Sequence, residues 1–78
     1  MIIDVTAEDI EKGFPDSPCF CPIARAVKRI KASYSDVVVE SEMILAGSDK
    51  FILPQIARDF IRRFDMGYGE IGPFSFEV

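Results

Sequence analysis

The chain of 78 residues contains no histidine and no tryptophan, and it has only two cysteines. Without histidine it lacks the commonest general base and the commonest metal ligand, so no Ser/His/Asp set can form and zinc enzymes are disfavoured. No apolar run approaches the roughly 18 residues that span a membrane, and no basic-then-apolar signal peptide opens the sequence. We therefore expect a cytoplasmic protein that is not an enzyme, has no cofactor and does not contact a membrane.

Charge limits the partners further. The formal net charge is −4, whereas proteins that bind long nucleic acids carry a surplus of Lys and Arg to neutralise phosphates. Extended nucleic acid is therefore not expected as a partner. An apolar share of 49%, including seven phenylalanines, is enough for one packed core. A domain this small has a thin stability margin, so we expect a homo-oligomer.

The first half of the chain predicts one strand and two helices. Residues 2–5 are apolar and mostly β-branched, which is typical of a strand. Thr6 then caps a short helix that stops at Gly13. Two prolines make residues 14–21 a loop, and Pro22 suits the first position of a helix that runs to about Ser33. One face of that helix is apolar: Ile23, Ala26, Val27, Ile30 and Tyr34.

The second half predicts strands followed by a helix and a last strand. The segments DVVVE and MILAG are read as strands, and residues 43–46 and 50–53 as a tight hairpin across the turn GSDK. Pro54 opens a helix that continues to about Met66 and is stopped by Gly67 and Gly69. Its expected buried stripe is Ile56, Ala57, Phe60, Ile61 and Phe64. The alternation from Phe74 to Val78 indicates a half-buried strand.

The predicted fold is a single α+β domain over residues 1–78, with the order β-α-α-β-β-β-α-β. We expect a small, mainly antiparallel sheet of three or four strands that is covered by two longer helices and one short helix. The two terminal strands are candidates to pair with each other, although nothing local specifies that pairing.

The basic residues are concentrated on the two longer predicted helices. All except Lys12 and Lys50 lie there: Arg25, Lys28, Arg29, Lys31, Arg58, Arg62 and Arg63. If both helices pack on one face of the sheet, their exposed sides converge into one positive surface that favours a small anion. The alternative is an ordinary solvated helix face, with Asp59 paired to Arg62 or Arg63.

The stretch SPCFCPIARA places Cys19 and Cys21 one residue apart at the start of the first basic helix. A disulfide between them would close a small strained ring. A structural zinc site needs four ligands, so only a dimer that pools four thiols would complete it. The helix dipole favours the Cys21 thiolate, but no histidine is present to act as its base. The plainest interpretation is a small, partly buried residue at position 21 and a loop thiol at position 19.

Two other patterns in the sequence do not match known ion-binding or phosphate-binding loops. The acidic residues Asp4, Glu8, Asp9 and Glu11 do not have the spacing of a calcium loop. The glycines of GYGEIG follow a helix, so they indicate helix termination and not a phosphate-binding loop. Tyr68, between two of them, is expected to be exposed.

The motifs VTAEDI, CPIARAV, FIRRFDMG and PFSFEV occur in this order along most of the chain. In these it resembles a family of small uncharacterised proteins from bacteriophage and actinobacterial genomes. The resemblance supplies no catalytic residue. It implies a protein that acts by binding, either by blocking a host protein or by sequestering a signalling molecule in defence against host immunity.

These observations lead to two hypotheses about function, besides a less favoured thiol- or zinc-dependent protein. The first is a non-enzymatic protein that sequesters an anionic, nucleotide-like ligand. Its predicted binding residues are Ser17, Phe20, Arg25, Arg29, Arg58 and Arg62, with Ser17 donating to phosphate, Phe20 stacking on a base and the arginines supplying charge. The second is a protein–protein interaction module or inhibitor that binds a host protein through its basic helices.

Overall fold

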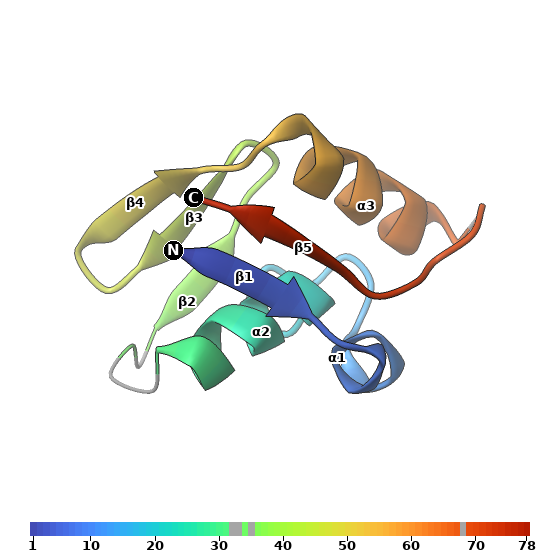
Figure 1. Ribbon diagram of the computed structural model, residues 1–78, viewed down its shortest axis with the longest axis horizontal. Coiled ribbons are helices and arrows are strands. Elements are labelled where there is room, and N and C mark those ends of the chain that lie inside the picture. Colours follow the sequence, from blue (N-terminus) through green and yellow to red (C-terminus); the bar gives the residue numbers. More distant parts are fainter. Residues whose placement is uncertain (32–33, 35, 68) are drawn as a thin grey trace.

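The computed structural model describes residues 1–31, 34, 36–67 and 69–78. In chain order its elements are β1 (Ile2–Val5), α1 (Ala7–Lys12), α2 (Pro22–Ile30), β2 (Val37–Val39), β3 (Met43–Ala46), β4 (Asp49–Ile52), α3 (Gln55–Met66) and β5 (Phe74–Glu77) (Figure 1). This confirms both the α+β class and the predicted order of helices and strands.

The strands form two antiparallel sheets, whereas one sheet of three or four strands was expected. β2, β3 and β4 follow one another as a meander, with Val38 opposite Leu45 and Ile44 opposite Phe51. β1 pairs with β5, with Ile3 opposite Phe76. Short turns pair the middle strands with their sequence neighbours, and this leaves the two terminal strands to pair with each other.

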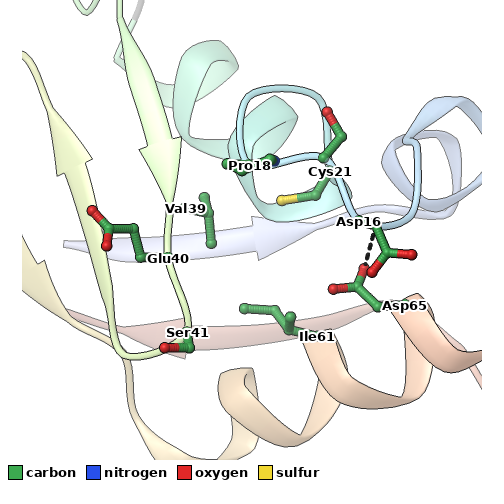
Figure 2. Close-up of a pocket in the computed structure, with 9 residues that line it drawn as sticks. Asp16, Pro18, Cys21, Val39, Glu40, Ser41, Ile61 and Asp65 are labelled. Carbon is green, nitrogen blue, oxygen red and sulfur yellow. Dashed lines mark hydrogen bonds between the residues drawn. The ribbon is translucent and has the colours of Figure 1, made fainter.

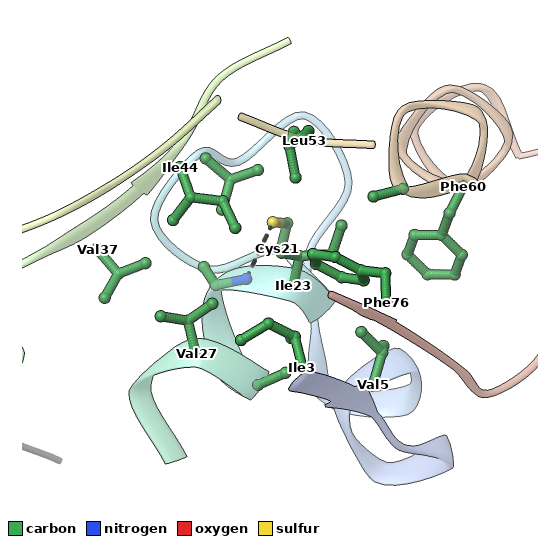
Figure 3. Packing of buried hydrophobic residues seen from close by; sticks show 14 of the residues in the cluster. Ile3, Val5, Cys21, Ile23, Val27, Val37, Ile44, Leu53, Phe60 and Phe76 are labelled. Carbon is green, nitrogen blue, oxygen red and sulfur yellow. Dashed lines mark hydrogen bonds between the residues drawn. The ribbon is translucent and has the colours of Figure 1, made fainter. Parts of the chain in front are cut away.

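One hydrophobic core joins both sheets to the two longer helices (Figure 3). Its largest buried side chains include Ile3, Val5, Ile23, Val27, Val37, Ile44, Leu53 and Phe60. Burying a side chain of this size stabilises the fold by about 1.5–3 kcal/mol before entropy is counted. The phenylalanines fasten α3 to β5, since the ring centroids of Phe60 and Phe74 are 4.6 Å apart.

Most of the predicted helix ends are confirmed. Thr6 caps α1, Cys21 caps α2 with Pro22 in the first turn, and α3 ends at Gly67. Gly67 has φ +70, the left-handed conformation that glycine adopts without steric cost.

Three details of the helices differ from prediction. α2 ends at Ile30 and is capped by Lys31, so it is shorter than expected, and Ser33 lies outside the described residues. Ile30 and Ile56 were expected in the buried faces but are 37% and 51% exposed. Each lies near a helix terminus, where the helix extends beyond the core and one apolar side chain remains in solvent.

Candidate functional site

The six predicted binding residues are distributed over three hollows in the surface. Phe20, Arg25 and Arg29 line one, Ser17 lines a second, and Arg58 and Arg62 line a third. α2 and α3 lie on either side of the β1–β5 pair in Figure 1. The two helices therefore present their arginines in different places, and the single positive surface expected from the sequence does not form.

The first hollow, here called the Phe20 hollow, has a volume of about 450 Å³. It is lined by Glu8 and Asp9 of α1, Phe20 of the preceding loop, and Arg25, Lys28 and Arg29 of α2. Three basic side chains thus face two carboxylates, which leaves a small excess of positive charge. Successive turns of α2 place positions 25, 28 and 29 on one side because residues three and four apart are neighbours on a helix.

Asp9 is the buried polar centre of this hollow, with an exposed fraction of 1%. Its Oδ1 accepts a hydrogen bond from Arg29 Nη1 at 2.6 Å, and its Oδ2 accepts one from the backbone N–H of Thr6 at 3.0 Å. Arg25 Nε lies 3.7 Å from the same Oδ1. Burial raises the pKa of Asp9, but the hydrogen bonds from Arg29 and Thr6 outweigh it and hold the pKa below the ordinary value. Asp9 is therefore ionised at neutral pH.

The two arginines are not equally available to a ligand. Arg29 is committed to the fold, because its Nη1 bonds Asp9 and its Nη2 donates to the backbone carbonyl of Asp4 at 2.7 Å. Arg25 makes only the longer contact to Asp9 among the interactions of the described residues. Arg25 is therefore the arginine with donors to spare.

Phe20 and Lys28 form the other wall of the Phe20 hollow. Phe20 is 58% exposed, and Lys28 Nζ lies over its ring, 4.9 Å from the centroid. The same ammonium group donates to the backbone carbonyl of Cys19 at 2.7 Å, which fixes it over one face of the ring. A further hollow of about 370 Å³ meets the first at these two residues and is also lined by Asp36 and Val37. Lys28 was noted as basic in the sequence but was not predicted as a site residue, since nothing local showed that Phe20 would turn toward it.

The other two hollows adjoin along α3 and are together called the α3 groove. The acidic part has a volume of about 280 Å³ and the basic part about 480 Å³. The acidic part is lined by Asp16, Ser17, Pro18, Cys21, Val39, Glu40, Ser41, Ile61 and Asp65, and Figure 2 shows Glu40 on the side away from Asp16 and Asp65. The basic part is lined by Ser41, Glu42, Gln55, Arg58, Ile61 and Arg62. Ser41 and Ile61 belong to both.

Ser17 lines the acidic part of the groove and none of the hollows that hold the other five predicted ligand-binding residues. Its Oγ accepts a hydrogen bond from the backbone N–H of Phe20 at 3.2 Å, which shapes the loop before α2. Asp16 and Asp65 line the same hollow, and their charges oppose a phosphate there. The predicted role of Ser17 as a phosphate donor therefore does not fit its surroundings.

Both cysteines are free thiols. Cys21 is buried, and its Sγ accepts a hydrogen bond from the backbone N–H of Ala24 at 3.4 Å, as an N-cap residue does. Burial raises the pKa of this thiol in spite of that hydrogen bond, and the charge of Asp65 raises it further. The expectation that the helix dipole favours a Cys21 thiolate is therefore wrong, because desolvation outweighs it.

Two remaining observations concern metals and membranes. Within the described ranges, no three side chains of Cys, Asp or Glu come together as they would to hold a metal ion. No helix in the described part of the chain has the length and apolar character needed to cross a bilayer. Tyr68, singled out in the sequence, lies outside the described residues.

The chain matches no protein-family model, and no curated protein or solved structure was found to be significantly similar to it. The resemblance to small phage and actinobacterial proteins thus stays a prediction.

Proposed function

We propose that the protein is a non-enzymatic binding protein that takes a small, anionic, ring-containing ligand of nucleotide type in the Phe20 hollow. The observation that carries the proposal is the pairing of an exposed aromatic face with cations: Phe20 is 58% exposed, Lys28 Nζ is 4.9 Å from its ring, and Arg25 lines the same hollow. An aromatic platform beside Lys and Arg suits a ligand with a flat ring and a phosphate.

The contributions of the residues differ. Stacking of a base on an aromatic side chain is worth about 1–3 kcal/mol, and Phe20 supplies this contribution. Arg25 and Lys28 supply charge-assisted hydrogen bonds to phosphate, while Arg29 positions Asp9 and the wall of α1. Ser17, Arg58 and Arg62, which the sequence also suggested, are not part of this proposal because they line other hollows.

The ligand is small because of the charge around the hollow. Glu8 and Asp9 line it, and the whole chain carries a net charge of −4. A long polyanion would meet this negative charge beyond the few basic side chains, whereas a single nucleotide would not. Sequestration of such a ligand in a phage-type context, by a homo-oligomer, belongs to the same proposal.

Isothermal titration calorimetry with adenosine monophosphate, adenosine and inorganic phosphate tests the proposal. The nucleotide is expected to bind at least fivefold more tightly than either part alone, and Phe20→Ala or Arg25→Gln should weaken its binding at least fivefold. Arg62→Gln is the matched control, since it removes an arginine that lies in the α3 groove. The proposal fails if no nucleotide binds, or if Arg62→Gln weakens binding as much as Arg25→Gln does. Light scattering on the same samples gives the oligomeric state.

The second candidate is a module that binds a host protein through its helices. It is favoured by the exposed charge of α3, since the side chain of Arg62 is 60% exposed and Arg58 lines the same hollow. Exposed charged side chains of one sign attract a partner surface of the opposite sign. Binding of a partner that survives Phe20→Ala but is lost on charge reversal of Arg62 would favour this candidate over the first.

A further inference from the structure

The α3 groove is a second binding surface, separate from the Phe20 hollow, with which it shares no lining residue. Its two parts meet at Ser41 and Ile61, so the groove runs along α3 beside the turn between β2 and β3. A ligand could therefore occupy the α3 groove whether or not an anion binds in the Phe20 hollow.

One end of the groove is acidic and has an apolar floor. Asp65 of α3 is held toward the loop before α2, because its Oδ1 accepts a hydrogen bond from the backbone N–H of Asp16 at 2.9 Å. Figure 2 shows both carboxyl groups at one end of the hollow, with the side chains of Cys21, Val39 and Ile61 directed into the space beside them. Within the described ranges no Lys or Arg pairs with Asp16 or Asp65, since the ion pairs there involve Glu8, Asp9 and Asp59.

The other end is basic. Arg58 and Arg62 are one turn apart on α3, and both line this part of the groove. Arg58 Nε donates to the backbone carbonyl of Leu53 at 2.9 Å, so its guanidinium is held at the start of the helix. Its terminal nitrogens make no hydrogen bond to another described residue and can donate to a ligand. The side chain of Arg62 is 60% exposed, and its Nη2 lies 3.3 Å from Asp59 Oδ1. Glu42 also lines this end and reduces its positive charge without cancelling it.

The combination selects among ligands. A phosphate or a nucleotide fits one end but is repelled by Asp16 and Asp65 at the other. A metal ion would need a group of ligating side chains that is not found among the described residues. A lysine or arginine side chain fits the acidic end, because its aliphatic stem packs on an apolar floor while its charged head meets a carboxylate.

We propose that the α3 groove binds an extended peptide segment of a partner protein, with a lysine or arginine at the Asp16–Asp65 end and a glutamate or aspartate at the Arg58–Arg62 end. The spacing of the charged residues along α3 matches the spacing of side chains along an extended peptide. With a helical rise of about 1.5 Å per residue, Asp65 lies about 4.5 Å along the axis from Arg62 and about 10 Å from Arg58. In an extended peptide, alternate side chains point the same way about 6.5 Å apart, so a basic and an acidic residue separated by one position span the groove.

The experiment is a nuclear magnetic resonance titration of the 15N-labelled protein at low salt with capped pentapeptides. The probes are Gly-Lys-Ala-Glu-Gly, its reverse-charge order Gly-Glu-Ala-Lys-Gly, and the singly charged Gly-Lys-Ala-Ala-Gly and Gly-Ala-Ala-Glu-Gly. One doubly charged peptide is expected to bind at least fivefold more tightly than either singly charged one, and to shift amide signals of residues 39–41 and 58–65. Because the charges meet near the surface, its affinity should fall as ionic strength rises.

Variants assign the two ends. Asp65→Asn keeps an oxygen to accept the Asp16 N–H but removes the charge, so it should weaken the preferred peptide about fivefold. Arg62→Glu changes an exposed side chain and leaves the core untouched, so folding is retained. This variant should no longer bind the peptide with one lysine and one glutamate, and it should bind Gly-Lys-Ala-Lys-Gly instead. Glu77→Gln and Lys31→Gln are matched controls, which remove one charge of each sign outside the groove and should leave the affinity unchanged.

Three results would overturn the proposal. In the first, all four initial peptides bind equally or none binds. In the second, Arg62→Glu still prefers the peptide with one lysine and one glutamate to Gly-Lys-Ala-Lys-Gly. In the third, the groove is covered by a second copy of the chain, which would appear as a concentration-dependent dimer that Asp65→Asn dissociates.

Discussion

Asp9 connects the stability of the fold to the charge of the Phe20 hollow, and replacing it with asparagine tests both. One carboxylate oxygen accepts from Arg29 and the other from the Thr6 N–H. Asparagine has only one oxygen, so one of these donors would face an amide NH2 group. The substitution also leaves the charges of Arg25 and Arg29 without their counterion.

The magnitude follows from the exposure of each partner. Breaking a fully buried ion pair costs about 3–5 kcal/mol, and the side chain of Asp9 is only 2% exposed. The side chains of Arg25 and Arg29 are 35% and 46% exposed, however, so water partly solvates the charges left behind. We therefore expect a loss of about 2–3 kcal/mol in the free energy of unfolding. For a domain of this size that lowers Tm by about 10–20 °C.

The same substitution should improve anion binding. A phosphate about 6 Å from Asp9 is repelled by about 1 kcal/mol in the high effective dielectric near a surface. Asp9→Asn removes this repulsion, so the affinity for adenosine monophosphate should rise about fivefold while the fold becomes less stable. A purely structural role for Asp9 would give the loss of stability without the gain in affinity.

The dependence on pH has a definite sign. The folded pKa of Asp9 is below the ordinary value, so its charge contributes stability above the unfolded pKa of about 3.9, and this stability is lost as pH falls through the folded pKa. The difference in Tm between wild type and Asp9→Asn should therefore be constant above about pH 5 and shrink below about pH 4.

Thermal denaturation followed by circular dichroism at pH 7 and pH 3, with calorimetry for the ligand, measures these effects. Glu11→Gln is the control, because it removes the same charge from an exposed position of the same helix. The reasoning is refuted if the two variants melt within about 2 °C of each other at pH 7, or if the Asp9→Asn difference is as large at pH 3 as at pH 7.

Two further predictions concern glycine packing and the thiols. In urea denaturation, Gly13→Ala should lower the free energy of unfolding by about 2–3 kcal/mol, because the added Cβ would lie 2.7 Å from Pro22 Cδ. Gly67→Ala should lower it by only about 1 kcal/mol, because φ at this position is +70 but no atom lies within 4 Å of the added Cβ. Equal losses for the two variants would contradict the packing argument. Iodoacetamide at pH 8 should modify Cys19 in the native protein and Cys21 only after unfolding, since burial raises the Cys21 pKa. Mass spectrometry of the native protein should show one modified cysteine. Rapid modification of both cysteines would contradict the prediction, because it would mean that the Cys21 thiol is accessible.

Local signals in the sequence predicted the elements well. Thr6 before an acidic first turn, Pro22 at a helix start and Gly67 at a helix end each act on the adjacent backbone, so they can be recognised without tertiary structure. The pairing of β1 with β5 was left open because its partners are far apart in the sequence. The number of sheets was predicted wrongly for the same reason, since it depends on which strands meet in space.

The candidate site was only partly predictable. Arg25 and Arg29 could be assigned to one helix face from their spacing. Their common counterion, Asp9, is 16 residues from Arg25 and 20 from Arg29 in the sequence, and it reaches them only because α1 packs on α2. The sequence also suggested that the arginines of α3 would join those of α2, and this failed because helical periodicity places side chains around one helix and does not say where a second helix lies.

Pairing of the terminal strands has a kinetic consequence. The backbone N–H of Val78 donates to the carbonyl of Met1, so this sheet closes nearly the whole chain into a loop. Closing about 75 flexible residues costs about 4 kcal/mol of chain entropy, several times the cost for the short β3–β4 hairpin. We expect the meander and α2 to form first and the terminal sheet to form last. Among the strands of the folded protein, hydrogen exchange should then be fastest at the ends of β1 and β5, and the Asp9–Arg29 contact would keep the N-terminal segment attached to α2 while those strands separate.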